Sequence, residues 1–199
     1  MEDVERQGLS TGKKSTPGRI ILLNGASSSG KTVLARALQD RIETPFWHLS
    51  IDHFRDSGVL PMARIARRDF RWSDLRGRFF AGFHATLAAC AEAGNDLIVE
   101  HILEDEGWCE TLIELLKPFN VYFIGVHCSL EELTRREVAR GDRLLGSAAR
   151  DFHSVHIGRC YDIEVQSEAG VTVNIPKLLD GWRSGCRQSD FSPRPQFKP

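Results

Sequence analysis

Apolar runs and helical patterns alternate along the 199 residues of the chain. Four runs are short, rich in Ile, Val, Leu or Phe, and without polar alternation, which indicates strands that are buried on both faces. They are residues 19–24, 47–51, 96–100 and 120–127, and a weaker fifth run covers 162–166. Because helical patterns separate these runs, the sequence predicts an α/β fold with a doubly wound, five-stranded parallel sheet.

The segments between the runs predict the helices. Their apolar residues recur at helical spacing, and residues that begin or end helices flank them. Gly94 is expected to end the helix over residues 69–92, and Pro118 the helix over residues 104–117. Ser129 and Glu132 form a capping box at the start of the helix from residue 130. The expected helices cover residues 31–43, 69–92 and 104–117, a helix from residue 130, and residues 148–159.

Length and composition favour one domain with two tails. The domain is expected at residues 18–183, because residues 1–17 are polar and residues 184–199 are polar and rich in proline. The first segment carries acidic residues and no apolar core, so we expect neither a signal peptide nor a membrane anchor there. No apolar run approaches the length of a bilayer span, so we expect no membrane partner.

Charge and cysteine content narrow the possible partners. The formal net charge is −1, so no global basic field favours a nucleic acid or a membrane surface. The five cysteines are scattered, without a CxxC pair or metal-ligand spacing. Their odd number fits reduced thiols and a cytoplasmic protein. Any phosphate chemistry must therefore be local, and the oligomeric state is left open.

A phosphate-binding motif directly follows the first predicted strand. The segment 25–32 matches GxxxxGK[ST] at every fixed position, which predicts a bound nucleoside triphosphate. Gly25 and Gly30 let the backbone curl so that its N–H groups face the phosphates, and Lys31 adds a positive charge. The hydroxyl of Thr32 can ligate Mg²⁺. The alternative is a turn of small residues that happens to precede Lys-Thr. The candidate binding residues are Gly25, Ala26, Ser27, Ser28, Ser29, Gly30, Lys31 and Thr32.

Acidic residues follow the second and third predicted strands, at the sheet edge where open parallel sheets bind ligands. Asp52 can accept the proton of an acceptor hydroxyl as that hydroxyl attacks the γ-phosphate. Its alternative role is a helix N-cap. Glu100 can hold Mg²⁺ directly or through water. His101 next to it is interpreted as a neutral histidine behind the site, with acceptor positioning as the alternative.

A basic segment supplies the third candidate element. Arg136, Arg140 and Arg143 lie four and three residues apart, so they share a helix face if the helix continues that far. Arginines on a lid can neutralise the transferring phosphoryl group and exclude water. The alternative is a solvated helix face on which they pair with neighbouring acidic residues. Gly141 and Gly146 favour the hinged lid.

Two segments resemble a known family. Residues 137–148, which contain the run RGDRLLGSA, and residues 155–165 look like the lid and last strand of the chloramphenicol phosphotransferases. The phosphate loop of that family, Asn-Gly-x-Ser-Ser-x-Gly-Lys, is similar to residues 24–31, and the resemblance covers about residues 19–180. It implies a shikimate-kinase-like P-loop kinase that transfers the γ-phosphate of ATP to a hydroxyl of a small molecule, with a chloramphenicol-type antibiotic as the leading acceptor. The aspartate that the family uses as a base corresponds to Asp52.

The resemblance is weakest between Asp52 and Gly94, where the family builds its acceptor pocket. The third strand also ends in Glu100, where the family more typically has aspartate. Several arginines in this region favour a polar or anionic acceptor, although a solvated helix face explains them equally well; they are Arg55, Arg67, Arg68, Arg71, Arg76 and Arg78. Two other functions stay open: a kinase of a metabolite, nucleotide or nucleotide-sugar, and a nucleotide-dependent regulatory protein that hydrolyses slowly.

Overall fold

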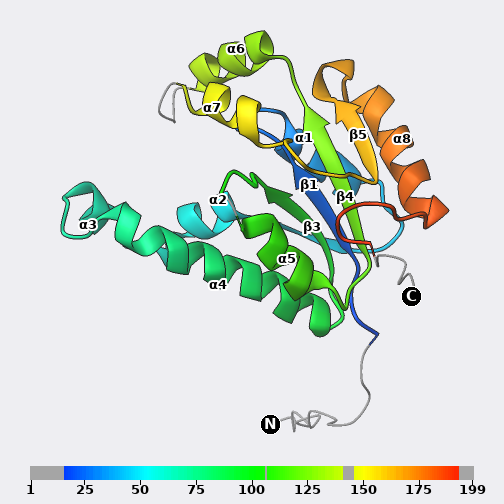
Figure 1. The fold of residues 1–199 in the computed structure, drawn as a ribbon, viewed down its shortest axis with the longest axis horizontal. Coiled ribbons are helices and arrows are strands. Elements are labelled where there is room, and N and C mark those ends of the chain that lie inside the picture. Colours follow the sequence, from blue (N-terminus) through cyan, green and yellow to red (C-terminus); the bar gives the residue numbers. More distant parts are fainter. Residues whose placement is uncertain (1–15, 106, 141–145, 193–199) are drawn as a thin grey trace, which may run out of the picture.

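The computed structural model describes residues 16–105, 107–140 and 146–192. Its centre is a sheet of five parallel strands in the order β2-β3-β1-β4-β5 (Figure 1). The predicted doubly wound α/β fold is therefore confirmed, and every strand lies within one residue of its expected bounds. The strands are β1 (Ile20–Asn24), β2 (Phe46–Ser50), β3 (Asp96–His101), β4 (Val121–His127) and β5 (Ile163–Gln166).

The expected helices are present. They are α1 (Lys31–Gln39), α4 (Trp72–Glu92), α5 (Trp108–Leu116), α6 (Leu130–Arg140) and α7 (Ser147–Ser154). The α1, α4 and α5 helices are shorter than predicted, and α7 begins one residue earlier and ends five residues earlier. The structure adds elements that the pattern did not predict: α2 (Ile51–Phe54), η1 (Arg55–Val59), α3 (Met62–Ala66), η2 (Ser167–Ala169) and α8 (Val171–Ser184). The α8 helix contains Pro176, a residue that usually interrupts a helical pattern. The other added elements are too short to show a period.

Helices cover both faces of the sheet. Successive side chains of β1 point to opposite faces, and all of them are buried, so both faces must be covered. Ile21 and Leu23 face the cluster under α1 and α8, which includes Leu34 and Leu178. Ile20 and Leu22 face the opposite cluster, with side chains of α4 and α5. β1 is therefore buried on both faces, which explains its continuous apolar sequence. The loop that follows β1 leaves the middle of the sheet at its carboxyl edge.

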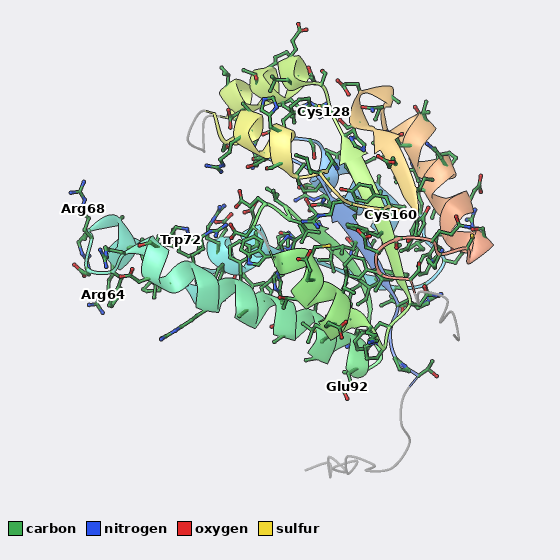
Figure 2. The ribbon with its side chains drawn as sticks, viewed as in Figure 1. Arg64, Arg68, Trp72, Glu92, Cys128 and Cys160 are labelled. Atoms are coloured by element: carbon green, nitrogen blue, oxygen red, sulfur yellow. The ribbon has the colours of Figure 1, made fainter. Side chains whose placement is uncertain are left out.

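The α2–α4 region extends away from the sheet next to β2. Figure 1 shows α3 and the first turns of α4 projecting beyond the other elements. Arg64 and Arg68 lie at the far end of this projection (Figure 2). The second half of α4 packs on the sheet through Phe83, Leu87 and Ala91. α4 thus joins an exposed end to the core.

Part of the expected C-terminal tail packs against the domain. Backbone N–H groups of Gln188 and Ser189 donate to Asp162 Oδ1 at 2.6 and 3.1 Å. Phe191 packs edge-on against Phe123, with 4.9 Å between ring centroids. Of the expected N-terminal tail, 1–17, only residues 16 and 17 are described. Residues 193–199 of the expected C-terminal tail lie outside the described residues. Within the described ranges, no helix is both long and apolar enough to span a bilayer.

Candidate active site

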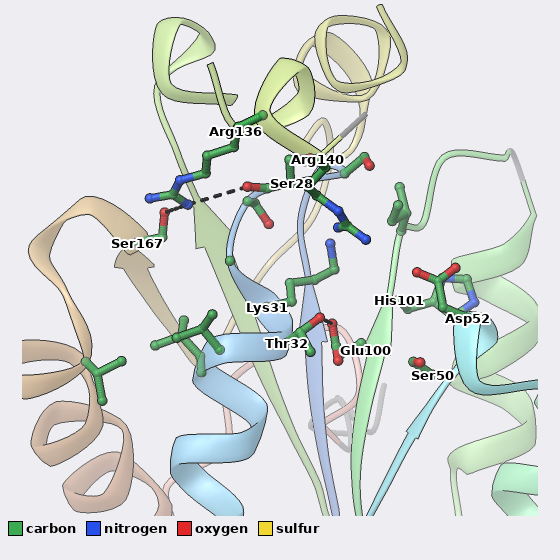
Figure 3. Close-up of a pocket in the computed structure, with 18 of the residues that line it drawn as sticks. Ser28, Lys31, Thr32, Ser50, Asp52, Glu100, His101, Arg136, Arg140 and Ser167 are labelled. Carbon is green, nitrogen blue, oxygen red and sulfur yellow. Dashed lines mark hydrogen bonds between the residues drawn. The ribbon is translucent and has the colours of Figure 1, made fainter. Parts of the chain in front are cut away.

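A cavity of about 500 Å³ opens at the carboxyl edge of the sheet. The phosphate loop and the start of α1 form its floor, and residues from the ends of β2 and β3 form one side. Residues of α6 and of the segment before α8 form the other side (Figure 3). Parallel strands place ligand sites at this edge because connecting loops and helix N-termini converge there. The cavity therefore brings together segments that the sequence separates by more than a hundred residues.

The phosphate loop has the backbone shape that its small residues allow. Gly30 precedes α1 with φ of 94°, a conformation that glycine adopts without strain. A Cβ on Gly25 would lie 2.4 Å from the carbonyl oxygen of Val126, so only glycine fits there. Lys31 Nζ donates to the carbonyl oxygens of Gly25 and Ala26, each at 2.8 Å. The loop and its ammonium group thus form a compact cationic surface at the helix N-terminus.

Thr32 and Glu100 lie side by side at the base of the cavity. Thr32 Oγ1 donates to Glu100 Oε2 at 2.8 Å, and His48 Nε2 lies 2.6 Å from Glu100 Oε1. Burial raises the pKa of Glu100, but the hydrogen bond from His48, the Lys31 charge and the hydrogen bond from Thr32 outweigh it, so the pKa is lowered. An ionised carboxylate next to a hydroxyl is an oxygen donor set that fits Mg²⁺. This is the pair that the sequence proposed for the metal.

Asp52 lies in the first turn of α2 and lines the cavity across from Ser167 (Figure 3). Ser50 is the N-cap of α2, and its Oγ accepts the N–H of His53 at 3.2 Å. The alternative role of Asp52 as the N-cap is therefore taken by Ser50. The half-buried Asp52 carboxylate faces Arg55, with 3.2 Å between Oδ1 and Nη1. The carboxylate thus lines the cavity while it is paired with Arg55.

Arg136 and Arg140 reach the cavity from α6. Arg136 Nη1 donates to Ser167 Oγ at 3.2 Å and to the carbonyl oxygen of Ser28 at 3.4 Å, while its Nε donates to Glu132 at 2.7 Å. It therefore joins the phosphate loop to the segment after β5. Figure 3 shows Arg140 pointing toward Lys31. Arg143, the third arginine of the expected lid, lies outside the described residues.

Comparison with known proteins identifies the family. Residues 18–179 match the family model described as chloramphenicol phosphotransferase-like protein. The chain belongs to the chloramphenicol phosphotransferase-like family. Among curated proteins, the "Putative O-phosphotransferase Rv2636" of Mycobacterium tuberculosis strain H37Rv is 29% identical, in an alignment that covers 85% of this chain and 84% of that protein.

Solved structures of other kinases share the fold of this family member. The APS kinase CysC of Mycobacterium tuberculosis, in complex with AMPPNP and APS, superposes with a TM-score of 0.63 at 14% identity, over 84% of this chain and 98% of that one. A gluconokinase from Sinorhizobium meliloti has a TM-score of 0.55 at 15% identity, over 85% of this chain and 94% of that one. Identities this low establish the shared P-loop kinase fold alone.

His101 of this phosphotransferase-like chain packs into an aromatic cluster behind the cavity. Its Nε2 lies 2.8 Å from Nε2 of His84, and Phe80 and Trp108 stack at 4.2 Å between centroids beside them. Burial lowers the pKa of His84 to about 4, and burial together with the charge of His84 lowers that of His101 to about 3. Both imidazoles are therefore neutral near pH 7. This geometry favours the interpretation of His101 as a neutral histidine behind the site, although its side chain borders the cavity.

The basic stretch between Asp52 and Gly94 is largely paired with carboxylates. Arg64 and Arg67 contact Asp69 at 3.0 and 3.5 Å, and similar pairs join Arg71 to Asp74, Arg55 to Asp56, and Arg76 to Glu104 and Asp105. None of the arginines between residues 55 and 78 lines the described cavity. A solvated helix face therefore accounts for this stretch better than an anionic acceptor does.

Several residues that shape the site were not predicted from the sequence. His48 was part of a predicted strand, yet its ring contacts Glu100. Ser167 contacts Arg136, and the Asp151 carboxylate contacts the phosphate loop. These contacts span 52, 31 and 124 positions of the chain. No local motif marks contacts of such separation; only the topology of the sheet brings them together.

Proposed function

We propose that this chain transfers the γ-phosphate of ATP to a hydroxyl of a small molecule, in a complex with Mg²⁺. One observation carries the proposal. A single cavity is lined by the phosphate loop with Lys31, the Thr32–Glu100 pair and the carboxylate of Asp52. Motors and switches share the first two features, whereas a carboxylate on the opposite wall suits an acceptor.

The phosphate side of the cavity would hold the nucleotide. Backbone N–H groups of residues 25–32 and the ammonium of Lys31 neutralise the phosphates at the N-terminus of α1. Thr32 and Glu100 would hold Mg²⁺, which would neutralise phosphate charge. His48 orients the Glu100 carboxylate through its other oxygen. Arg136 and Arg140, with Arg143 in the same proposed lid, stabilise the charge that develops on the transferring group.

The acceptor side would supply the base. Asp52 accepts the proton of the acceptor hydroxyl while that oxygen forms a bond to the γ-phosphorus. The bond between the γ-phosphorus and the bridging oxygen of the leaving diphosphate breaks, so that ADP departs and the phosphorylated acceptor remains. Catalysis of this kind depends mainly on position and charge, since the side chains form no covalent bond to the phosphoryl group.

Family membership supports one class of acceptor. A chloramphenicol-type antibiotic is the leading candidate, because the family model that matches residues 18–179 carries that description. Ion pairing of most arginines between residues 55 and 78 weakens the sequence argument for an anionic acceptor. A hydroxylated metabolite is the second candidate, because small-molecule kinases share this fold.

The test is a coupled ADP-release assay with ATP and Mg²⁺, followed by mass spectrometry of the acceptor. We expect chloramphenicol, or another member of a panel of hydroxylated antibiotics, sugars and nucleosides, to gain one phosphoryl group. The Lys31→Ala variant is the control for contaminating kinases. ADP release that is slow, independent of every acceptor and without a phosphorylated product would contradict the proposal and favour a regulatory nucleotide hydrolase.

A further inference from the structure

Two buried carboxylates of the α6–α7 unit have no part in the proposed chemistry. Glu137 of α6 is 3% exposed and Asp151 of α7 is 2% exposed. Neither side chain lines the described cavity. Burial of a carboxylate is costly unless hydrogen bonds compensate. The contacts of these two residues therefore indicate what the fold uses them for.

Asp151 contacts the phosphate loop directly. Its Oδ2 accepts the backbone N–H of Ser27 at 3.1 Å, and its Oδ1 lies 3.4 Å from Arg150 Nη2. The next loop residue, Ser28, has φ of 63°, which is the left-handed region that non-glycine residues rarely adopt. A hydrogen bond to a buried side chain thus holds the peptide group between Ala26 and Ser27, one residue before the strained Ser28.

Glu137 fixes the helix that carries Asp151. Its carboxylate accepts the backbone N–H groups of Gly146 and Ala148 at 2.8 and 2.9 Å, and the hydroxyl of Ser147 at 2.5 Å. These hydrogen bonds satisfy the first N–H groups of α7, which have no partner within the helix. They also lower the pKa of Glu137, so the carboxylate stays ionised. α7 is therefore attached to α6 at its N-terminal end.

Apolar packing supports the same arrangement. Ala148 and Val155 of the α7 region are fully buried against Leu133 of α6 and Ala26 of the phosphate loop. Arg136 reaches the loop from α6, one residue before Glu137, through the carbonyl oxygen of Ser28. The loop is thus held from both sides of its strained residue.

We propose that Asp151 is a positioning residue that sets the shape of the phosphate loop, and that Glu137 holds the helix from which Asp151 acts. The inference rests on the proposed function, because it concerns the same nucleotide site. The hydrogen bond to Ser27 keeps the following N–H groups turned toward the cavity before the nucleotide arrives. The free energy needed to adopt the strained turn is then supplied when the chain folds. Nucleotide binding does not have to supply it, so the affinity for the nucleotide is higher.

Two substitutions separate the hydrogen bond from the charge. Asp151→Asn keeps an oxygen that can accept the Ser27 N–H, whereas Asp151→Ala removes the acceptor and leaves that buried donor without it. We expect Asp151→Ala to weaken binding of AMPPNP with Mg²⁺ about tenfold and to raise the KM for ATP similarly. We expect Asp151→Asn to stay within about threefold of the unmodified protein. Asp180→Ala, at an exposed carboxylate of α8, is the matched control.

Calorimetric binding of AMPPNP to the full chain is the main measurement. Equal affinity of Asp151→Ala and the unmodified protein, or equal losses in Asp151→Asn and Asp151→Ala, would overturn the inference. If Asp151→Ala fails to fold, NMR of the Ser27 amide in the unmodified chain and in Asp151→Asn decides the matter. We expect slow solvent exchange of that amide in both, and fast exchange without nucleotide would also overturn it. Failure of the unmodified chain to bind AMPPNP would instead contradict the proposed function.

Discussion

The two sides of the cavity differ in how the chain builds them. The phosphate side comes from the continuous segment of β1, the loop and α1, where backbone groups and one lysine face the cavity. The acceptor side comes from separate segments, with Asp52 in α2 and His101 at the end of β3. Aromatic packing from α4 and α5 supports it, including contacts between Phe54 and Phe83 at 5.4 Å.

The two sides of the cavity therefore differ in how many substitutions they tolerate. A site made of backbone N–H groups depends on loop shape, which few substitutions can leave intact. A site made of side chains on separate helices can change one residue at a time while its fold persists. If the proposed function is correct, the phosphate side determines the class of reaction, and the acceptor side determines the molecule that reacts.

The largest effect is expected on the phosphate side. Lys31→Ala removes the ammonium that contacts the loop carbonyl oxygens and that would neutralise the phosphates. We expect kcat/KM to fall by about 1000-fold or more, with the ADP-release assay as the measurement. Lys177→Ala, which removes an exposed lysine on α8, is the control and should retain full activity. Near-normal turnover of Lys31→Ala would place the reaction elsewhere.

A smaller and more selective effect is expected on the acceptor side. Asp52→Asn keeps the shape of the side chain but cannot accept a proton, so we expect kcat to fall about 100-fold. AMPPNP affinity should change by less than about threefold, because Asp52 lies on the wall away from the phosphate loop. Asp56→Asn is the matched control, since Asp56 also contacts Arg55 but is more exposed. Full activity of Asp52→Asn would exclude its role as the base.

The same contrast explains what the sequence could predict. The strands, the sheet class and the phosphate loop follow from patterns within short windows, and the residue types at 25–32 have few other uses. Thr32 and Glu100 were both predicted to contribute to a Mg²⁺ site, and their side chains lie in hydrogen-bond contact. The pairing of Glu100 with His48 was not predictable, since it depends on strand order and register.

The acceptor side was hardest to predict for a physical reason. α2 and α3 are too short to show a helical period, so the sequence between Asp52 and α4 was expected as a basic stretch without elements. Its arginines were interpreted by charge alone, whereas their partners depend on turns that bring residues such as Arg64 and Asp69 together. The structure of such short segments is determined by tertiary contacts, which a local sequence pattern does not show.

The histidine pair provides a test of the acceptor side through stability. His84 and His101 have native-state pKa values of about 4 and 3, below the ordinary value of about 6.5. As the pH falls below about 6.5, the unfolded chain binds protons that the folded chain excludes, so the free energy of unfolding decreases. His84→Gln should reduce the slope by about 1.4 kcal/mol per pH unit between pH 6 and about pH 4.5.

Urea unfolding at several pH values measures this slope. The same comparison at pH 8, where both imidazoles are neutral in the unfolded chain too, isolates the cost of the substitution itself. If the free energy of unfolding changes with pH by the same slope in the unmodified protein and in His84→Gln, burial does not lower the pKa of His84. We expect the affinity for AMPPNP to be unchanged in His84→Gln, since His84 does not line the cavity and His101 lies on its acceptor side.

The smallest effect is expected at the exposed end of the acceptor region. Arg67 lies 3.5 Å from Asp69 and is largely exposed, and an exposed ion pair of this kind contributes less than about 1 kcal/mol. We expect Arg67→Gln to change the acceptor KM and kcat by less than about twofold, measured with whichever acceptor gains the phosphoryl group. If the basic stretch attracts an anionic acceptor, Arg67→Gln should instead raise the KM for that acceptor. The increase in KM should be larger at low salt, where charges are screened less. A salt-dependent increase of KM in Arg67→Gln would extend the acceptor side beyond the cavity, onto the projecting helices.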